Sequence, residues 1–344
     1  MADRHGSNAQ ATPPHGRHTR GPGAVGGSPG CARPSARRPP RPPGTVRAVR
    51  ARYYDRAMGI TVQRLTYYPV KGCAGIDVDR AAVGATGLEH DRTFMVVDAA
   101  DGAFRSQRTH PVMAAVRTAV LDGGGVLRLA AEGLGDLEVK VDPGAERRPV
   151  SLFDKPVGHG VDQGDEAAAW LSEVLGAPSR LVRVPEDFDR DGWGDTPGKV
   201  AFADAHAVLV ASQASLDGLN ARIGAAGAAP VPMDRFRANI VLAGCGQAHD
   251  EDLMRRLRIG TVELAHSVRA TRCAVPMVDQ ATGLRAGPEP VRSLSQYRRE
   301  PVYGNKVSFG AKAAVLRTGT LAVGDAVEAE WYEGGSPDPR RPAS

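Results

Sequence analysis

The sequence of 344 residues has little of what marks membrane, secreted or zinc-binding proteins. Only 5% of its residues are aromatic, and its four cysteines (Cys31, Cys73, Cys245 and Cys273) lack the spacing of a disulfide framework or a zinc site. No segment approaches the ~18 apolar residues that a membrane-spanning helix needs. We therefore expect reduced thiols, a cytoplasmic location and no membrane partner.

Nucleotide-binding loops are also missing. The segment that begins at Ile240 contains Gly244 and Gly246, but His249 stands where a dinucleotide-binding fingerprint needs its third glycine. No Walker-type phosphate loop occurs. The histidines show no i, i+4 pairing on a predicted helix, so a histidine-based metal site is not expected.

Net positive charge is confined to the first 57 residues. The 11 arginines and two aspartates of residues 1–57 give that segment +9, and because the whole chain carries +5, the remainder carries −4. Nucleic-acid binding needs its positive charge on the folded surface, so we expect no nucleic-acid partner. The segment is rich in proline, glycine and arginine and is predicted to be disordered, as are residues 333–344. Nucleic-acid binding through this segment alone is a weak alternative, which its deletion would abolish.

The rest of the chain is a series of short strands with few helices. Apolar patterns predict strands at 60–70, 207–211 and 237–244, a strand–turn–strand pair at 126–142, a hairpin-like pair at 257–270, and closing strands within 312–330 around Gly319 and Gly324-Asp325. A hairpin is predicted at 93–108 with its turn at Asp101-Gly102. Helices are predicted at 165–176, 215–223 and 290–299.

These elements predict a mainly β protein with some α (α+β), built as two β-barrel-like lobes. The acidic, glycine-rich segment 186–199 is the expected boundary, which places the lobes at residues 58–185 and 195–332. No alternation of strand and helix is present, so a parallel α/β sheet is not expected.

Cys273 is the most informative single residue. It follows Arg272 at the end of a predicted strand, and no second cysteine lies within the two to four residues that a zinc site would need. A lone thiol beside a cation favours a thiolate, either as a nucleophile or as a soft metal ligand. The residues alone leave both interpretations open.

Other cationic and small polar residues stand at strand ends. Taken singly, each is more often a surface charge or an ion-pair partner. Together they are what an anionic, phosphate-bearing ligand requires, because lysine offers a point charge, arginine a bidentate fork and glycine a close backbone approach. They are Lys71-Gly72-Cys73, Asp91-Arg92, Gln107-Arg108, Arg235, Arg237, Asn239 and Thr271-Arg272.

Longer segments carry a family resemblance. Among them are YYPVKGCAG (67–75), GLEHDRTFMVVDAADGAFRSQR (87–108), LVASQASLDGLNARI (209–223), MDRFRANIVLAGC (233–245), RCAVPMVDQATG (272–283) and GTLAVGDAVE (319–328). From Ile60 to Glu328, in this order, they resemble the molybdenum cofactor sulfurase C-terminal (MOSC) family with its own N-terminal β-barrel domain. In layout the amidoxime-reducing, mitochondrial-type members and their bacterial relatives are the most similar. Ordered matches are more specific than any single motif.

The resemblance implies a cofactor site between the two lobes that holds the molybdenum cofactor, a molybdopterin with its metal. Cys273 would be both the catalytic residue and the thiolate ligand of molybdenum, a role that suits a soft sulfur donor. Cys245 would be a buried structural thiol. Binding of pyridoxal phosphate is a further expectation. The resemblance assigns cofactor binding to Lys71, Gly72, Cys73, Arg92, Ser212, Arg237, Asn239, Thr271 and Arg272.

The implied function is reduction of small N-hydroxylated compounds, such as amidoximes and hydroxylamines. Some bacterial relatives add a C-terminal ferredoxin domain, but this sequence lacks the four clustered cysteines of such a centre. We therefore expect electrons from a separate protein of the ferredoxin, flavin reductase or cytochrome type. The alternative is a carrier of molybdenum cofactor or sulfur that uses Cys273 without turnover of a substrate.

This chain departs from the family pattern close to the expected site. It has Arg237-Ala238-Asn239 where Arg-Pro-Asn is common, and Phe309-Gly310-Ala311-Lys312 where Phe-Gly-Gln-Asn is common. The residues on either side of Cys273, at 268–270 and 276–279, differ as well. These departures bear on the identity of the substrate more than on cofactor binding.

Overall fold

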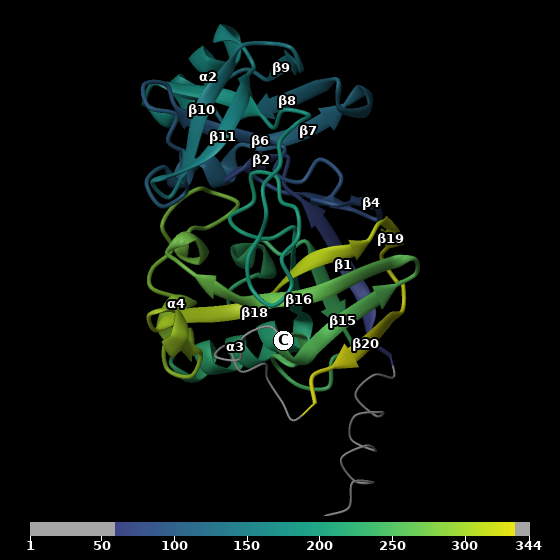
Figure 1. Ribbon diagram of the computed structural model, residues 1–344. Coiled ribbons are helices and arrows are strands. Elements are labelled where there is room, and N and C mark those ends of the chain that lie inside the picture. The colour runs from purple at the N-terminus through teal and green to yellow at the C-terminus, as the bar shows by residue number, and fades with distance from the viewer. Residues whose placement is uncertain (1–58, 334–344) are drawn as a thin grey trace, which may run out of the picture. The chain divides into compact units, whose positions relative to one another are not determined.

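The computed structural model describes residues 59–333. The predictions for 1–57 and, apart from Glu333, for 333–344 therefore lie outside the described residues. Strands dominate the described part (Figure 1), so the predicted mainly β class with some helix is confirmed.

The largest sheet has nine strands and draws on both ends of the described chain. Its path runs β20-β15-β16-β18-β13-β14-β1-β3, and β17 pairs with β18. Only β13 and β14 are parallel neighbours on this path. The strands are β1 Thr61–Tyr67, β3 Ile76–Val78, β13 Val208–Ser212, β14 Ile240–Ala243, β15 Met254–Ile259, β16 Val262–Arg272, β17 Arg299–Glu300, β18 Lys306–Arg317 and β20 Val327–Trp331.

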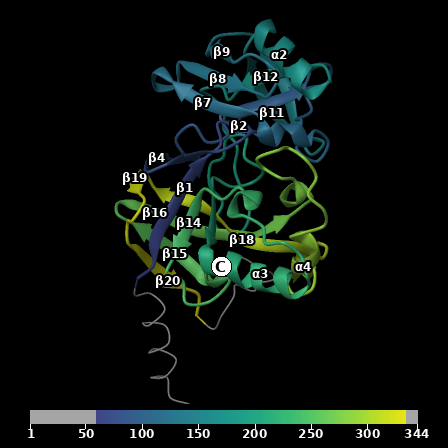
Figure 2. The same cartoon turned by 180° about the vertical axis from the view of Figure 1, so that it is seen from behind.

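The two ends of this sheet approach each other (Figure 2). An isolated antiparallel bridge joins Thr61 to Ala326. Beside it, the N–H group of Val62 donates to the carbonyl of Asp325, and that of Val327 donates to the carbonyl of Ile60, both at 2.9 Å. The sheet is therefore barrel-like, although no continuous ladder closes it among the described residues.

Helix α3 (Gln213–Ala225) packs against the middle of this sheet. It begins two residues before the predicted start at 215, because the side-chain oxygen of Ser212 accepts a hydrogen bond from the N–H group of Ser215 at 3.1 Å and caps the first turn. The strand before it, β13, is buried at every position, which explains its uninterrupted apolar sequence. The start of β13 lines the cavity described below, through Val208 and Leu209.

The other sheets are smaller. A five-stranded sheet runs β10-β11-β12-β6-β2, and two three-stranded sheets run β7-β8-β9 and β19-β4-β5. The strands are β2 Val70–Lys71, β4 Arg80–Gly84, β5 Gly87–Leu88, β6 Phe94–Asp98, β7 Arg117–Leu121, β8 Val126–Ala130, β9 Leu137–Lys140, β10 Arg147–Leu152, β11 Lys155–Asp162, β12 Ser179–Arg183 and β19 Gly319–Ala322.

Helix α2 (Asp165–Leu175) covers β12 and β9. Its first turn carries two acidic residues, and Gly176 ends it in the left-handed conformation at φ 62°, as the sequence predicts. Short 3-10 turns complete the fold: η1 Pro111–Ala115, η2 Asp122–Gly124, η3 Met233–Phe236, η4 Asp250–Leu253, η5 Val275–Met277 and η6 Pro301–Tyr303.

Two predicted elements differ from the structure. The return strand of the 93–108 hairpin is reduced to an isolated bridge between Val97 and Phe104, flanked by backbone hydrogen bonds of 2.8 Å from Asp98 to Ala103 and from Arg105 to Val96. No longer ladder forms, because the first residues of β6 pair with β2 and the N–H group of Phe104 donates to the carbonyl of Ser151 in β10. The basic helix predicted at 290–299 is reduced to α4 (Val291–Leu294), because the chain then enters the edge strand β17.

Candidate functional site

A cavity forms where β2, the residues just before β14 and the end of β16 meet the loop between β12 and β13. It brings together predicted residues that are up to about 200 positions apart in the sequence. The predicted cofactor and metal residues that line it are Lys71, Gly72, Arg92, Arg237, Asn239, Thr271, Arg272 and Cys273.

Two arginines enclose an aromatic ring beside the cavity. The guanidinium carbons of Arg92 and Arg237 lie 4.4 and 4.1 Å from the ring centroid of Tyr68. Both arginines have left-handed backbone, with φ 52° and 55°, and Arg92 donates to the carbonyl of Arg237 at 3.3 Å. Cations stacked on one ring hold their planes in a fixed orientation. The strained backbone is therefore part of a rigid cationic wall.

Asn239 positions this wall. Its side-chain oxygen accepts two hydrogen bonds, from Nη1 of Arg92 at 3.0 Å and from the N–H group of Leu209 at 3.1 Å. Its side-chain nitrogen donates a hydrogen bond to the carbonyl of Thr66 at 3.1 Å. Only 1% of the residue is exposed. Asn239 thus joins β1, β13 and Arg92, and its oxygen is already occupied by two protein donors.

Arg237 is the residue most suited to receive an anion. One nitrogen, Nη1, donates to Gln280 at 3.1 Å. The other, Nη2, is buried without a hydrogen-bond partner among the described residues. Desolvation lowers the pKa of Arg237. A buried, charged donor without a partner is costly, so a bound anionic oxygen would complete its hydrogen bonding.

Asp204 lies between two lysines on the other side of the cavity. It forms an ion pair with Lys71, and half of its side-chain surface (53%) still faces open space. Burial opposes its ionisation, but the charges of Lys71 and Lys312 outweigh burial and keep the pKa of Asp204 below its usual range. Desolvation lowers the pKa of Lys71 and brings that of Lys312 to about 8. One carboxylate therefore serves several cations, and positive charge remains in excess.

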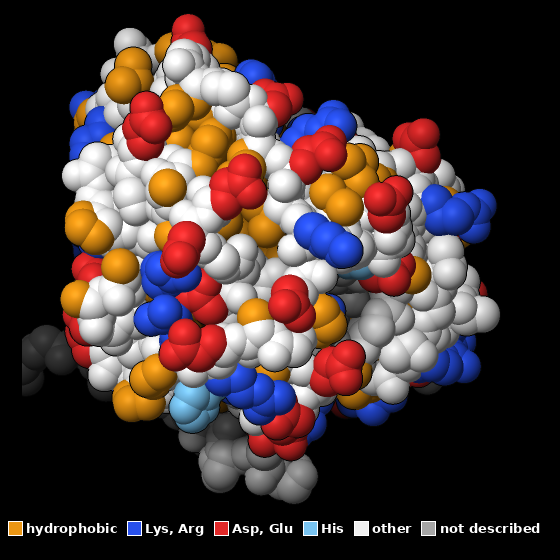
Figure 3. All heavy atoms as spheres, turned by 90° about the horizontal axis from the view of Figure 1, so that it is seen from above, with side chains coloured by type: hydrophobic (Ala, Val, Ile, Leu, Met, Phe, Trp, Pro, Cys, Tyr) orange, Lys and Arg blue, Asp and Glu red, His pale blue; other side chains and the backbone are white. Residues whose placement is uncertain are grey.

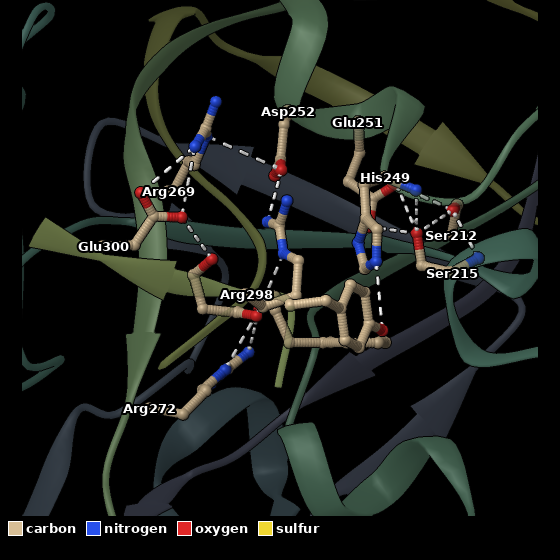
Figure 4. A network of polar contacts seen from close by, with 12 residues as sticks. Ser212, Ser215, His249, Glu251, Asp252, Arg269, Arg272, Arg298 and Glu300 are labelled. Carbon is tan, nitrogen blue, oxygen red and sulfur yellow. Dashed lines mark hydrogen bonds and ion pairs between the residues drawn. The ribbon is translucent and has the colours of Figure 1, made fainter. Parts of the chain in front are cut away.

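The end of β16 carries Arg272 into the cavity wall. Its Nε and Nη2 atoms donate to the carbonyl of Phe309 at 3.0 and 2.9 Å (Figure 4). Desolvation lowers the pKa of Arg272 to about 10. The next residue, Cys273, is exposed and lines the cavity, so its sulfur is accessible to a ligand.

Behind Arg272 lies a buried polar network, drawn in Figure 4. In this network the hydroxyls of Ser212 and Ser215 donate to the carboxylate of Glu251 at 2.7 Å. Arg298 forms an ion pair with Asp252, and Arg269 with Glu300. The members of this buried network are Ser212, Ser215, Glu251, Asp252, Arg269, Arg298, Glu300 and Ser308.

Two of the predicted cofactor residues are not brought to the cavity. Ser212 is fully buried, caps α3 and donates to Glu251, so its hydroxyl is used within the core. Cys73 is fully buried in the apolar cluster formed with Val70 and Phe94, and burial raises the pKa of its thiol to about 12. Cys245, expected to be a buried structural thiol, is half-buried against the core of the large sheet.

Sequence reasoning missed several residues of this site, among them Lys312, Asp204 and Tyr68. Lys312 stands in the segment that departs from the family pattern, which was the available signal. Asp204 lies in a loop without a motif, and Tyr68 lies in a strand end that gave no sign of stacking. Gln107 and Arg235, noted among the polar residues at strand ends, also line the cavity.

The cavity combines an accessible thiol with an excess of buried cations. No group of three or more metal-binding side chains of the His, Cys, Asp and Glu types occurs among residues 59–333, and no helix in that range is long and apolar enough to cross a membrane. On the face shown in Figure 3, acidic and basic side chains are interspersed. The arrangement is suited to a multiply anionic small molecule that brings its own metal and uses one protein sulfur.

Comparison with known proteins shows two matching domain families. Residues 59–178 match the MOSC N-terminal beta barrel domain, and residues 197–328 match the MOSC domain. Mitochondrial amidoxime-reducing component 1 of Mus musculus is 33% identical over 284 residues, which cover 78% of this chain and 81% of that protein. Mitochondrial amidoxime reducing component 2 of Bos taurus is 31% identical, with 78% and 82% covered.

A third relative is a longer protein, of which only part matches this chain. Molybdenum cofactor sulfurase of Danio rerio is 32% identical over 271 residues, which cover 74% of this chain but 32% of that protein. These similarities give no support to the expected pyridoxal phosphate site, and the expected cytoplasmic location stays a prediction.

Proposed function

This chain belongs to the family in which a MOSC N-terminal beta barrel domain precedes a MOSC domain, and from that premise we propose that it is a molybdenum-cofactor-dependent reductase of N-hydroxylated compounds. The two amidoxime-reducing components among its relatives support the reaction class. The observation that carries the proposal is the convergence on one cavity of the exposed Cys273 and of cationic side chains, among them Lys71, Arg92, Arg237, Arg272 and Lys312.

The residues present fit the molybdenum cofactor. The unpartnered Nη2 of Arg237 provides a donor for an anionic oxygen, and Lys71, Arg272 and Lys312 add positive charge around the same space. Phosphate and pterin oxygens accept hydrogen bonds of this kind. Cys273 offers the soft thiolate sulfur that a molybdenum centre accepts.

The chain's own residues would bind and orient the reactants. When bound, the cofactor supplies the two electrons that break the N–O bond of the substrate. Reduction of R–NHOH to R–NH₂ and water also consumes two protons. Asn239 holds Arg92 in place, the ring of Tyr68 fixes the planes of Arg92 and Arg237, and Cys273 would hold the metal at the open side of the cavity.

We propose that the electrons come from a separate redox protein, of the ferredoxin, flavin reductase or cytochrome type. The lack of four clustered cysteines in the sequence supports this part of the proposal, since such cysteines would be needed for an iron–sulfur cluster of the chain's own. The exposed position of Cys273 supports it as well, because a partner must approach the metal closely.

Turnover with an artificial electron donor tests the proposed function. The protein is purified from a host that makes the cofactor, and reduction of a model amidoxime is followed by product analysis. We expect turnover by the wild type and none by Cys273→Ala, while Cys245→Ala, a thiol outside the cavity, keeps the activity. A molybdenum-loaded wild type that reduces no N-hydroxy compound would contradict the proposal.

A second candidate function is a carrier of molybdenum cofactor or sulfur. The similarity to molybdenum cofactor sulfurase favours it, together with the accessible Cys273 thiol. Loaded protein would then show no reductase activity, and Cys273→Ser would abolish sulfur transfer to an acceptor.

A further inference from the structure

One wall of the cavity is apolar, and it begins with a strained turn. Strands β10 and β11 pair through Leu152 and Lys155, so Phe153 and Asp154 form a two-residue hairpin loop. Both have left-handed backbone, at φ 53° and 62°. Such loops favour asparagine and glycine, because a bulky side chain is strained at positive φ. An aromatic residue at this position therefore needs an explanation outside the turn.

The ring of Phe153 faces the cavity. It is 42% exposed and belongs to the cavity lining together with Phe104 and Arg108. The rings of Phe153 and Phe104 meet edge to face, with centroids 5.0 Å apart and an interplanar angle of 73°. The guanidinium carbon of Arg108 lies 4.7 Å from the centroid of Phe153. We call these three residues the aromatic wall.

The aromatic wall is held firmly. The N–H group of Phe104 donates to the carbonyl of Ser151, and the N–H group of Ser151 donates to the carbonyl of Gly102, each at 3.1 Å. Arg285, from the loop after Cys273, donates to the carbonyl of Arg108 at 2.6 Å. The neighbours of the exposed ring are thus held from two directions, while Phe153 itself keeps 42% of its surface exposed.

The remaining lining carries the charged groups that suit the cofactor, together with apolar residues such as Phe236, Val208 and Pro276. Phe236 is only 1% exposed and stacks on Phe309, whereas Phe153 is 42% exposed. A planar apolar group in the cavity therefore finds its most accessible ring on the aromatic wall, where it can stack and leave water. We propose that the aromatic wall binds an aryl group of the substrate, so that Phe153 selects aryl over alkyl N-hydroxylated compounds. This inference rests on the proposed function, of which it names the substrate class.

Steady-state kinetics with a matched pair of substrates tests this inference. Benzamidoxime is the simplest aryl amidoxime, and acetamidoxime is its alkyl counterpart. Phe153→Asn suits the left-handed turn, so we expect it to fold at least as stably as the wild type. It should raise the KM for benzamidoxime about fivefold, leave kcat unchanged and leave acetamidoxime unaffected, since an aromatic contact is worth about a factor of three to ten.

Two further variants serve as controls. Phe153→Tyr keeps the ring and should keep the aryl preference. Val323→Ala removes an apolar side chain that is equally exposed (42%) but does not line the cavity, and both KM values should stay unchanged. Equal changes for the two substrates in Phe153→Asn, or a loss of molybdenum from that variant, would overturn the inference, because the ring would then serve the fold or the cofactor.

Calorimetric binding separates this inference from the proposed function. The molybdenum-loaded protein is titrated with benzamidoxime and with acetamidoxime in the absence of an electron donor. A protein that binds benzamidoxime more tightly through Phe153, yet never reduces it, would overturn the proposed function alone. Equal affinity for the two compounds would overturn the aryl selection even if both are reduced.

Discussion

The cavity and the buried network of Figure 4 contain the same kinds of charged side chain, but their charges are balanced differently. In the buried network the carboxylates of Asp252 and Glu300 meet Arg298 and Arg269, while Glu251 accepts two serine hydroxyls. In the cavity, five of the seven lysines and arginines of the lining share two carboxylates, and Nη2 of Arg237 has no partner among the described residues. Those cations are Lys71, Arg92, Arg237, Arg272 and Lys312, and the carboxylates are Asp91 and Asp204.

The difference shows which charges serve the fold and which await a ligand. Buried charges that balance each other cost little further once they are hydrogen-bonded, so the network can be part of the core. Excess positive charge in a partly dry cavity is unfavourable until an anion arrives. A position in the cavity lining does not by itself mean that a residue binds the ligand. Asn239 lines the cavity, but its hydrogen bonds are made to groups of the fold.

Asn239→Ala should have the largest effect on stability. It removes hydrogen bonds to Arg92, Leu209 and Thr66 and leaves buried groups unpaired. We expect the free energy of unfolding to fall by about 3 kcal/mol, together with cofactor content. Chemical denaturation of the cofactor-free protein measures it. A fall below about 0.5 kcal/mol would assign Asn239 to the ligand instead of the fold.

Arg237→Ala should weaken cofactor binding strongly and change the stability of the cofactor-free protein little, the reverse of Asn239→Ala. Loss of a charge-assisted donor weakens binding of the cofactor about ten- to hundredfold. The cofactor-free protein should lose little thermal stability, because a desolvated charge without a carboxylate partner disappears. Arg258→Ala, an exposed ion-pair residue on β15, is the matched control. Equal cofactor content in both variants would remove Arg237 from the site.

Glu251→Gln tests the buried network through pH. Burial, and then the charge of Asp252, raises the pKa of Glu251 from 4.5 to about 7. Between these values the unfolded chain releases a proton that the folded protein keeps, so wild-type stability falls as pH rises from 4.5 to 7. Glutamine does not ionise, so the variant does not lose stability in this pH range for this reason. Its stability relative to wild type should therefore rise by on the order of 2 kcal/mol between pH 5 and pH 8.

Denaturant unfolding at the two pH values measures this shift. Glu328→Gln is the control, because Glu328 is exposed on β20 and its variant should run parallel to the wild type. Parallel behaviour of Glu251→Gln would show that Glu251 ionises in the fold as it does in water.

The sequence predicted the strands well where apolar residues follow one another without interruption. The five residues of β13 are all buried, and the helix predicted at 215–223 follows them as Gln213–Ala225, capped by Ser212. The return strand after Gly102 is shorter than predicted, because the segment bonds to β6 only at residues 96–98, while Phe104 also bonds to Ser151 and residues 106–108 line the cavity. Local pattern cannot show where such pairing stops.

In the site, too, local motifs predicted some residues, whereas residues that depend on distant contacts were missed. Residues in motifs at strand ends, such as Lys71, Arg237 and Cys273, were placed together in the cavity. Ser212 was assigned to the cofactor because of its motif, but its hydroxyl is used by the helix cap and by Glu251. Asp204 could not be found in this way, because its role depends on two lysines that lie far from it in the sequence.

Molybdenum analysis with X-ray absorption at the metal tests the central claim most directly. Wild-type protein from a cofactor-competent host should contain about one molybdenum per chain. It should also show one more sulfur neighbour at the metal than Cys273→Ser, which should be largely depleted of molybdenum. Full occupancy and an unchanged sulfur count in Cys273→Ser, or wild-type protein without molybdenum, would contradict the account.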